Sequence, residues 1–327
     1  MDWNIVVDGG GTKTAVILGN KDVQFKGLSG SSNVFTLSSE AVVDTVKSAI
    51  EDALNKRNLQ YKDVLTLQQV KHINIGLAGA SSVSKEKLDH TKKLFKQCYQ
   101  SSTVDLVSDA FLLPLACSIH SKYYITLIAG TGSSSMCFER GTELKFLGRS
   151  GGWGPHFGDN GGGYSIGREL IVSTLKHIDE YNVIKPFKPQ YQMKSIHKQV
   201  LHQIVGHHTT NLSEFLTALK KFEDSSILGD SRKQIASLTK IIFEELENDD
   251  GSEVVAKEIL IKESQSLVDI IKPFCNIVDD NTTLILSGSL FSLKPYKDYF
   301  FENLVQSNIK FPTEIVLDPA STALQNM

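Results

Sequence analysis

The sequence predicts an α/β protein of two related lobes, each built on a mixed β-sheet with helices on both faces. Its 327 residues, 41% of them hydrophobic, are enough for two separate cores. A glycine-rich turn between two β-prone runs occurs twice, at residues 8–13 and 129–135. Each turn is followed by a further strand and then by alternating helices and strands. We therefore expect two similar lobes with the functional site in a cleft between them.

The first lobe is expected to span residues 1–119. Its long helix near 38–57 is predicted from Val42, Val46 and Ile50, which recur at helical spacing. Apolar runs separated by turn residues predict the other elements: strands at 3–8, 14–19 and 23–28 before that helix, then a strand at 72–77, a helix at 84–98, a strand at 103–107 and a helix at 109–119.

The second lobe is expected to span residues 120–327, because the same pattern starts again at residue 123. It carries a predicted helical insertion between roughly 164 and 280. The elements expected on either side of that insertion are strands at 123–129, 134–139 and 144–148, then a strand at 283–287, a helix at 295–307, a strand at 313–317 and a short final helix.

Two other nucleotide-binding patterns do not fit this order of elements. A single Rossmann-type sheet needs a helix directly after Gly9-Gly10-Gly11, but β-branched and apolar residues follow in alternation. A Walker A loop needs Gly-x-x-x-x-Gly-Lys-Ser/Thr, and the sequence has no such run. We therefore interpret both glycine-rich turns as hairpins.

The composition narrows the class of partner and the compartment. With 34 basic and 37 acidic side chains the formal net charge is -3, which gives no basic surplus for nucleic acid or an anionic membrane, so the ligands are expected to be small. No apolar run approaches the roughly 20 residues that span a bilayer, and the N-terminus lacks the residue order of a signal peptide. We expect a cytoplasmic protein.

The four cysteines are expected to be buried free thiols in a reducing compartment. They stand far apart and form no Cys-x-x-Cys pair, which argues against an iron–sulfur cluster, a structural zinc ion or a disulfide framework. The residues concerned are Cys98, Cys117, Cys137 and Cys275.

The two hairpin turns suit a polyphosphate. Glycine has no Cβ, so backbone N–H groups can approach an anion closely, and threonine hydroxyls add donors. Asp8 is placed to hold Mg²⁺ through water. Two matched loops in two matched lobes favour this interpretation over tight hairpins without a ligand. The expected phosphate contacts are Gly10, Gly11, Thr12 and Lys13 in the first turn, and Gly130, Thr131, Gly132 and Ser133 in the second.

A glycine-rich loop at residues 151–163 indicates a second ligand site. So much glycine costs folding entropy unless backbone must approach a ligand. Asp159 can accept hydrogen bonds from two vicinal hydroxyls, and Trp153 offers a flat apolar surface of the kind that sugars use. A mobile surface loop or hinge would also be rich in glycine, but would seldom contain Trp and Phe.

Asp109 has two interpretations. It stands where an apolar strand ends and a helix begins, and an isolated aspartate there is usually a helix N-cap. Its position just before the second phosphate loop also suits a carboxylate that orients a hydroxyl and takes its proton during phosphoryl transfer. The two roles are compatible, and we keep both.

Three further signals are weaker. Asn33 follows the third strand in a Ser/Gly/Asn turn and is placed to direct its amide into the cleft. Gly288 and Ser289 end an apolar strand of the second lobe, where a nucleoside is expected. Four histidines resemble a metal site, but their spacing matches no zinc motif and favours a solvated helical face: His197, His202, His207 and His208.

Taken in chain order, the motifs resemble the N-acetylglucosamine kinases, in the BadF/BadG/BcrA/BcrD-type ATPase branch of the sugar kinase, Hsp70 and actin superfamily. The resemblance implies a duplicated ribonuclease-H-like fold, a cleft that closes on a sugar, Mg-ATP as the donor, and a homodimer. The motifs that carry it are Asp8-Gly-Gly-Gly-Thr-Lys, Ser108-Asp109-Ala110, Ala129-Gly-Thr-Gly-Ser, Gly151-Gly-Trp-Gly with Gly158-Asp159, and Ser287-Gly-Ser.

The resemblance also implies roles for individual residues. Asp109 would be the catalytic base at the sugar 6-hydroxyl, and Ala236 would lie where the insertion meets the adenosine. The implied sugar contacts are Asn33, Gly152, Trp153 and Asp159, and the residues implied to lie near ATP are Thr12, Thr131 and Ser289.

The sequence departs from the family pattern at two places. Asp159 is followed by Asn160 rather than by an acidic residue, which removes one charge from the rim of the sugar site and leaves the identity of the sugar open. The chain ends at Met327, soon after Ser321-Thr322-Ala323-Leu324, so the helix that returns to the first lobe is expected to be short.

These observations support one leading function and three alternatives. The leading one is an ATP-dependent kinase for the 6-hydroxyl of N-acetylglucosamine. A kinase for glucosamine, N-acetylmannosamine, N-acetylmuramic acid or glucose would need the same machinery. An ATPase that activates a dehydratase through an iron–sulfur cluster shares the fold but needs cysteines placed differently. A non-catalytic sugar sensor would be expected to lack the base at Asp109.

Overall fold

The computed structural model describes residues 2–11, 13–20, 22–80, 83–142, 144–224 and 231–325. The chain forms two compact units, Met1–Thr126 with Glu314–Met327, and Leu127–Thr313. The sequence predicts a boundary after residue 119 and a second lobe of residues 120–327, with a short last helix that returns to the first lobe. In the structure the first unit extends to Thr126 and also includes Glu314–Met327, because helix α12 (Pro319–Gln325) packs on the sheet of that unit.

The first unit contains a five-stranded sheet with the strand order β3-β2-β1-β4-β5. β1 is antiparallel to β2, which is antiparallel to β3, whereas β4 and β5 run parallel to β1 and to each other. The carboxyl ends of β1, β4 and β5 therefore meet at one edge. The strands are β1 (Trp3–Gly9), β2 (Thr14–Gly19), β3 (Gln24–Ser29), β4 (Val70–Leu77) and β5 (Thr103–Ser108).

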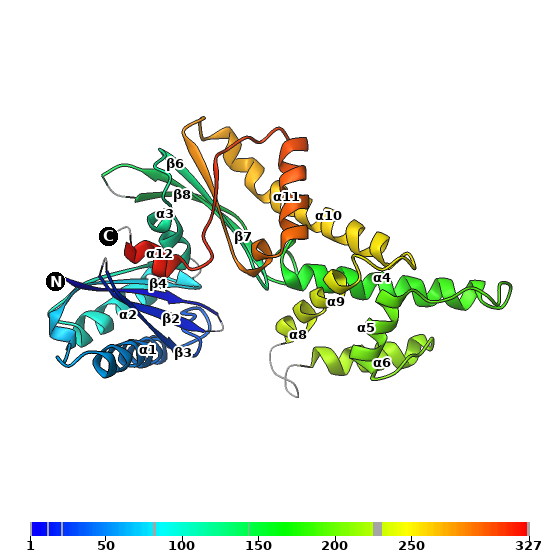
Figure 1. Cartoon of the computed structure of the whole chain (residues 1–327), viewed down its shortest axis with the longest axis horizontal. Helices are drawn as coiled ribbons and strands as arrows, with labels where there is room; N and C mark the ends of the chain where they lie inside the picture. The colour runs from blue at the N-terminus through cyan, green and yellow to red at the C-terminus, as the bar shows by residue number, and fades with distance from the viewer. Residues whose placement is uncertain are drawn as a thin grey trace. The chain divides into compact units, whose positions relative to one another are not determined.

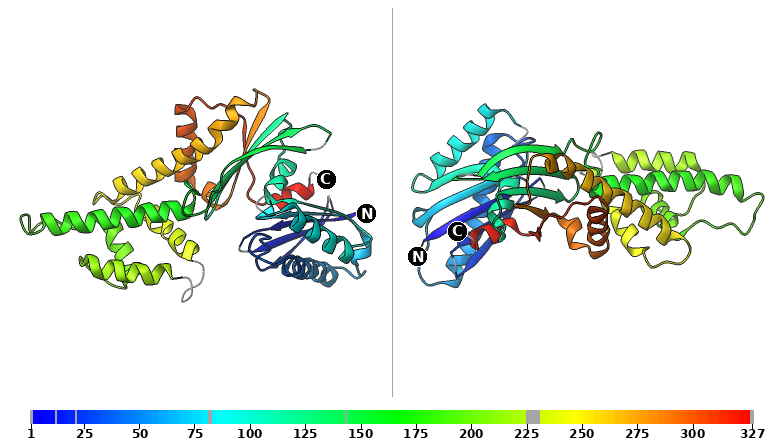
Figure 2. Two further views of the ribbon diagram at one scale, coloured as in Figure 1. Left: turned by 180° about the vertical axis from the view of Figure 1, so that it is seen from behind. Right: turned by 90° about the horizontal axis from the view of Figure 1, so that it is seen from above.

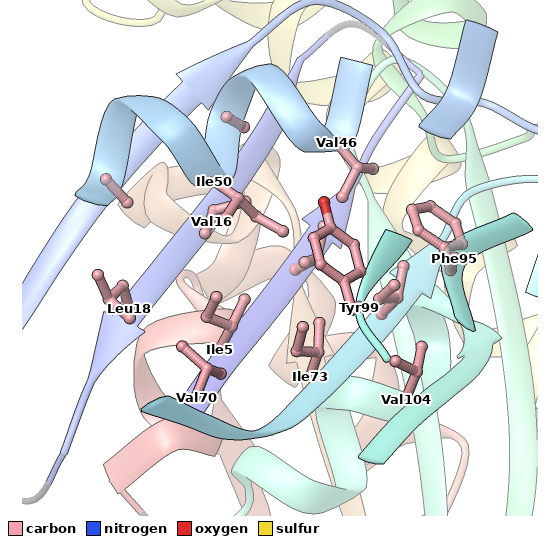
Figure 3. Close-up of a cluster of buried hydrophobic side chains, with 14 of the residues drawn as sticks. Ile5, Val16, Leu18, Val46, Ile50, Val70, Ile73, Phe95, Tyr99 and Val104 are labelled. Atoms are coloured by element: carbon pink, nitrogen blue, oxygen red, sulfur yellow. The ribbon is translucent and has the colours of Figure 1, made fainter. Parts of the chain in front are cut away.

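Two helices cover one face of this sheet, α1 (Ser39–Gln60) and α2 (Lys85–Cys98). Alternate residues of a strand point to the same face, so Ile5 and Ile73 pack with Val46 and Ile50 of α1 in one buried cluster (Figure 3). Ser38 begins α1 by accepting a hydrogen bond from the N–H of Ala41. Burial of this apolar face is the main force that orders the unit.

The opposite face carries α3 (Leu112–Ala116) and α12, as Figure 1 shows. The two helices contact each other. Gly76 of β4 faces α3 so closely that a Cβ there would lie 2.6 Å from a methyl carbon of Leu112. α12 is attached at its N-terminal end, where Lys26 pairs with Asp318 at 2.7 Å and the Ser321 hydroxyl donates to Gln24 at 2.6 Å.

The second unit is built around a sheet with the order β10-β9-β6-β7-β8. Each strand takes the place of its counterpart in the first sheet, with β6 in the position of β1 and β7 in that of β2. The predicted duplication is therefore confirmed. The strands are β6 (Tyr123–Ala129), β7 (Ser133–Arg140), β8 (Leu144–Gly151), β9 (Thr282–Ser287) and β10 (Thr313–Ile315).

Helices fill the long segment between β8 and β9. α10 packs on β7 and β8 and runs beside α4, and both views in Figure 2 show the two helices alongside each other. The helices of this segment are α4 (Gly163–Ile184), α5 (Ser195–Val205), α6 (Leu212–Glu223), α8 (Ser231–Ser237), α9 (Thr239–Glu244) and α10 (Ser252–Ile271), and α11 (Lys294–Gln306) follows β9. Among the described residues, no helix is long and apolar enough to cross a membrane.

Several local predictions were wrong. The helix expected at 109–119 is a 3-10 turn (Asp109–Phe111) followed by the short α3, and the strand expected at 313–317 ends at Ile315. All four cysteines are free, but Cys98 is exposed and Cys275 is partly exposed, so only Cys117 and Cys137 are buried as expected.

His197 corrects the prediction of a solvated histidine face. It is 1% exposed in α5, its ring stacks on that of His177 at a centroid distance of 4.3 Å, and its Nδ1 lies 3.1 Å from the Thr174 hydroxyl. His202, by contrast, is exposed. Burial, with nearby His177 and Lys194, lowers the pKa of His197 to about 3. Helix periodicity alone could not show which histidine faces α4.

This burial predicts a pH-dependent stability. An unfolded histidine binds its proton below about pH 6.5, whereas folded His197 stays neutral, so the free energy of unfolding should fall as pH drops from about 6.5 toward 3. Urea denaturation at pH 7.5 and 5.5 measures this change. Between the two pH values, the free energy of unfolding should fall less in His197→Gln than in the wild type. His202→Gln is the control, and its free energy of unfolding should fall with pH as much as that of the wild type. An equal fall in all three proteins would show that His197 is not the cause of the pH dependence.

Candidate active site

Four of the predicted site residues, Asp8, Gly11, Asn33 and Asp109, lie near one edge of the first sheet. Asp8 is the penultimate residue of β1, and Asp109 directly follows β5. A Cβ on Gly76, near the end of β4, would lie 3.0 Å from the Cα of Asp109, and a Cβ on Gly11 would lie 3.8 Å from the Nδ2 of Asn33. Parallel pairing of β1, β4 and β5 brings these segments together.

Asp109 is held by its immediate neighbours. Its Oδ1 accepts hydrogen bonds from the Ala110 N–H at 2.9 Å and the Ser108 hydroxyl at 3.0 Å. Burial raises the pKa of Asp109, while these two hydrogen bonds act in the opposite direction. Ser108 is the residue that precedes the 3-10 turn, so the predicted N-cap belongs to Ser108 and not to Asp109. Both of these hydrogen bonds are made to Oδ1, an arrangement that suits a base acting through Oδ2.

Asp8 is half-buried among charged groups of the same unit. Burial raises its pKa to about 6, and the negative charges of Asp109 and Asp318 act in the same direction. Lys13 and Lys26 oppose this shift. A carboxylate in this environment is stabilised in its charged form by a cation. Mg²⁺ commonly binds through one or two carboxylates together with waters and substrate phosphates, so Asp8 fits the predicted role.

The first hairpin turn is tightly closed. The Gly10 N–H donates to the Lys13 carbonyl at 2.9 Å, and the Gly10 carbonyl accepts from the Ser32 N–H at 3.2 Å. A Cβ on Gly9 would lie 2.5 Å from the Ser32 hydroxyl oxygen, which explains why glycine is needed there. The Lys13 side chain is exposed. The predicted phosphate contact Thr12 lies outside the described residues.

Asn33 lies on the loop that covers this turn. Its Oδ1 accepts from the Phe35 N–H at 2.9 Å, which fixes the side chain. Gly79, just beyond β4, has a φ of +79° and approaches the same oxygen, so that a Cβ on it would lie 2.4 Å away. The amide Nδ2 of Asn33 is directed toward the hairpin turn, as its closeness to Gly11 indicates. The structure thus joins Asn33 to the first loop.

The second hairpin turn is joined to the start of α4. The Gly130 N–H donates to the Gly132 carbonyl at 2.9 Å, and the Gly163 and Tyr164 N–H groups donate to the Gly130 and Thr131 carbonyls at 2.8 Å. The positive end of the α4 dipole therefore lies against this turn, an arrangement that favours a nearby anion. The sequence predicts two separate glycine-rich loops, residues 129–135 and 151–163. In the structure these hydrogen bonds join the two loops into one assembly.

Asp159 lies inside this assembly. It is 6% exposed and has a φ of 58°, a left-handed conformation that aspartate tolerates better than most residues. A Cβ on Gly132 would lie 2.6 Å from its Oδ2. Burial raises the pKa of Asp159, while Arg232, whose Nη2 lies 3.5 Å from Oδ2, and backbone N–H groups oppose the shift. The expected sugar contact is therefore also a neighbour of the second phosphate loop.

Gly152 and Trp153 are close in space to the same loop. Gly152 has a φ of +69°, and a Cβ there would lie 3.0 Å from that of Ser134. The Trp153 side chain is 66% exposed, which is unusual for so large an apolar group and leaves a flat face for a ligand. A hydrogen bond of 2.9 Å from Gly158 to Gly154 closes the turn between Trp153 and Asp159.

Of the three other predicted ATP residues, Gly288 lies beside the start of the second turn and Ala236 beside the start of α4. Gly288, with a φ of +100°, directly follows β9, and a Cβ on it would lie 2.3 Å from the carbonyl oxygen of Ala129, the last residue of β6. Ser289 follows it and is exposed. The Cβ of Ala236 in α8 would lie 3.3 Å from a Cβ on Gly163. Ala236, which the resemblance places where the insertion meets the adenosine, therefore lies beside the start of α4.

Sequence reasoning missed four charged or polar neighbours of these residues. Asp318 raises the pKa of Asp8, and Arg232 pairs with Asp159. Glu263 and Tyr296 form hydrogen bonds with the backbone of Gly161. None belongs to a glycine-rich motif, and no local pattern distinguishes them. The described part of the chain contains no group of three or more His, Cys, Asp or Glu side chains able to hold a metal ion together.

The fold of the chain is that of a known class of solved structures. A candidate N-acetylglucosamine kinase from Porphyromonas gingivalis has a TM-score of 0.70 at 15% identity, covering 99% of this chain and 98% of that one. A ROK family glucokinase from Streptomyces griseus, solved with glucose and AMPPNP, has a TM-score of 0.53 at 16% identity over 99% and 97% of the chains. These similarities establish the two-lobed sugar kinase fold.

The chain belongs to the BadF/BadG/BcrA/BcrD ATPase family, whose profile matches residues 6–323, so the predicted family is confirmed. An N-acetylmuramic acid/N-acetylglucosamine kinase from Clostridium acetobutylicum is 28% identical over 294 residues, 88% of this chain and 84% of that protein. An N-acetyl-D-glucosamine kinase from Dictyostelium discoideum is 31% identical over 186 residues, which span only 54% of this chain and 55% of that protein.

Proposed function

We propose that the protein is an ATP-dependent kinase that transfers the γ-phosphoryl group of ATP to the 6-hydroxyl of N-acetylglucosamine. The observation that carries this proposal is the position of Asp109, a partly buried carboxylate held on one oxygen at the edge where Asp8 and Asn33 also lie. The family, and the activities named for the two relatives, support the same reaction.

In the proposed mechanism Asp109 orients the sugar hydroxyl and takes its proton as the new P–O bond forms. Ser108 and Ala110 occupy Oδ1, which directs Oδ2 toward the acceptor. The raised pKa of Asp109 makes its carboxylate a better proton acceptor than an ordinary aspartate. Most of the rate enhancement then comes from positioning and from neutralising charge on the phosphates.

The two hairpin turns are proposed to bind the triphosphate. Their N–H groups, the Thr12 and Thr131 hydroxyls and the Lys13 ammonium would meet the phosphate oxygens. Asp8 would hold Mg²⁺, partly through water. When bound, Mg²⁺ neutralises charge on the β- and γ-phosphates. Ala236, Gly288 and Ser289 are proposed to lie near the nucleoside.

Asn33, Gly152, Trp153 and Asp159 are proposed to bind the sugar. Trp153 supplies an exposed apolar face, and the fixed amide of Asn33 supplies hydrogen-bond donors. The name of the Clostridium acetobutylicum relative includes N-acetylmuramic acid, so this sugar is the second candidate acceptor. We also propose that the protein acts in the cytoplasm as a homodimer.

The direct test is ADP release by purified protein with Mg-ATP across a panel of hexoses, N-acetylhexosamines and N-acetylmuramic acid, with a control lacking sugar. We expect the largest kcat/KM for N-acetylglucosamine. A preference for another sugar would keep the mechanism and change the acceptor. Sugar-independent release from protein with iron–sulfur absorbance would favour a dehydratase activator, and binding of sugar without release would favour a sensor.

The raised pKa of Asp8 predicts an acid limit to activity. Asp8 is protonated below a pKa of about 6, and a neutral carboxyl binds Mg²⁺ poorly, so kcat/KM for ATP should fall as pH drops through about 6. Mg²⁺ and the proton compete for the same group, so raising the Mg²⁺ concentration should move this limit to lower pH. A limit that does not respond to Mg²⁺ would remove Asp8 from the metal site.

A further inference from the structure

The backbone N–H and carbonyl groups of Gly161 each form a hydrogen bond with a buried side chain from a helix distant in the sequence. Its N–H donates to Oε2 of Glu263, in α10, at 2.6 Å, and its carbonyl accepts from the Tyr296 hydroxyl, in α11, at 2.7 Å. Glu263 is 3% exposed and Tyr296 is fully buried. Because water does not reach these groups, losing either side chain leaves a peptide group without its partner.

The residues on either side of Gly161 touch the second hairpin turn. The Asn160 carbonyl accepts from the Ser133 hydroxyl at 2.6 Å, and the Gly163 N–H donates to the Gly130 carbonyl at 2.8 Å. A displacement of the Gly161 peptide would therefore be passed to both ends of this turn. These two hydrogen bonds connect this segment to the turn and are made by Asn160, one residue before Gly161, and by Gly163, two residues after it.

Gly161 adopts a backbone conformation that residues with a Cβ rarely tolerate. Gly161 has a φ of +82°, and a Cβ on it would lie 2.4 Å from Leu267, so only glycine fits. Three consecutive glycines, residues 161–163, have many accessible conformations in the absence of outside contacts. The bonds from Glu263 and Tyr296 supply such contacts and select one conformation.

We propose that Glu263 and Tyr296 are positioning residues for nucleotide binding, which act by fixing Gly161 and so the hairpin turn at Gly130–Ser133. This inference rests on the proposed function, in which that turn binds the ATP triphosphate. A turn that is already ordered loses less conformational entropy when the phosphates bind, and its N–H groups are aimed before the ligand arrives.

The test uses three variants and two controls in the full chain. Glu263→Ala removes the acceptor, Glu263→Gln keeps an acceptor oxygen without the charge, and Tyr296→Phe removes the donor but keeps the ring. Glu258→Gln, on the exposed side of α10, and Tyr299→Phe, in α11, are the matched controls. For each protein we would measure the Kd of Mg-AMPPNP by calorimetry, the KM for ATP and for sugar, and the melting temperature.

We expect Glu263→Ala to raise the Kd and the KM for ATP by about tenfold or more, with a smaller change in the KM for sugar. Tyr296→Phe should also raise the Kd and the KM for ATP. Glu263→Gln should keep most of the nucleotide affinity that Glu263→Ala loses, and the two controls should match the wild type. If Glu263→Ala does not fold, Glu263→Gln combined with Tyr296→Phe still weakens both bonds and decides the question.

Two results would overturn the inference. One is a lower melting temperature in Glu263→Ala and Tyr296→Phe with nucleotide affinity unchanged, since the contacts would then serve stability alone. The other is a Glu263→Gln variant as defective as Glu263→Ala. A wild type that binds Mg-AMPPNP but phosphorylates no sugar would refute the proposed function while leaving this test intact, and a wild type that binds no nucleotide would refute both.

Discussion

Asp109→Asn is expected to lower kcat by roughly two to four orders of magnitude, the usual contribution of a general base. Asparagine has the same shape and can still accept the hydrogen bond that Ala110 donates to Oδ1, but its amide cannot take a proton. Nucleotide affinity should change little, because Asp109 is proposed to contact the acceptor hydroxyl. Turnover at saturating ATP and sugar, together with calorimetry of Mg-AMPPNP binding, separates the two effects.

The melting temperature of Asp109→Asn should not fall. Burial raises the pKa of Asp109 above that of an unfolded aspartate, so at neutral pH the folded state carries a desolvated charge that a neutral asparagine does not. Asp105→Asn is the matched control, because Asp105 is an exposed aspartate of β5, the strand that Asp109 follows. Unchanged turnover in Asp109→Asn would remove Asp109 from the mechanism.

Two glycines of the second hairpin turn are expected to respond differently to the same substitution. A Cβ on Gly132 would lie 2.6 Å from the Asp159 carboxylate, so Gly132→Ala must displace a buried group and should lower the melting temperature as well as activity. At Gly130, apart from the two neighbouring residues in the chain, no heavy atom of the described residues lies within 4 Å of the corresponding Cβ position. Gly130→Ala should therefore leave the folded protein as stable as the wild type.

Gly130→Ala should nevertheless weaken nucleotide binding by about tenfold or more, if the phosphates approach the backbone of this turn as proposed, because the methyl group would occupy their space. Melting curves and AMPPNP titrations of both variants test the pair. Normal nucleotide affinity in Gly130→Ala would show that the phosphates do not approach this face of the turn.

Much of the fold was predictable because strands and helices are encoded locally. The hairpin strands β1, β2, β6 and β7 lie within one residue of their predicted bounds, since apolar runs and turn residues define them. The early end of α3 was not predictable. The Ser118 and Ile119 N–H groups, which a longer helix would use, donate to Glu314, almost 200 residues away.

The candidate site was likewise predictable only in part. The glycine turns, the strand ends with Asp8 and Asp109, and the family were accessible from the sequence, because each depends on residues close together in the chain. Only the tertiary structure brought Glu263 and Tyr296 to Gly161, Arg232 to Asp159, and Asp318 near Asp8. Burial and hydrogen bonds between segments depend on which faces meet after folding, and no local pattern contains that information.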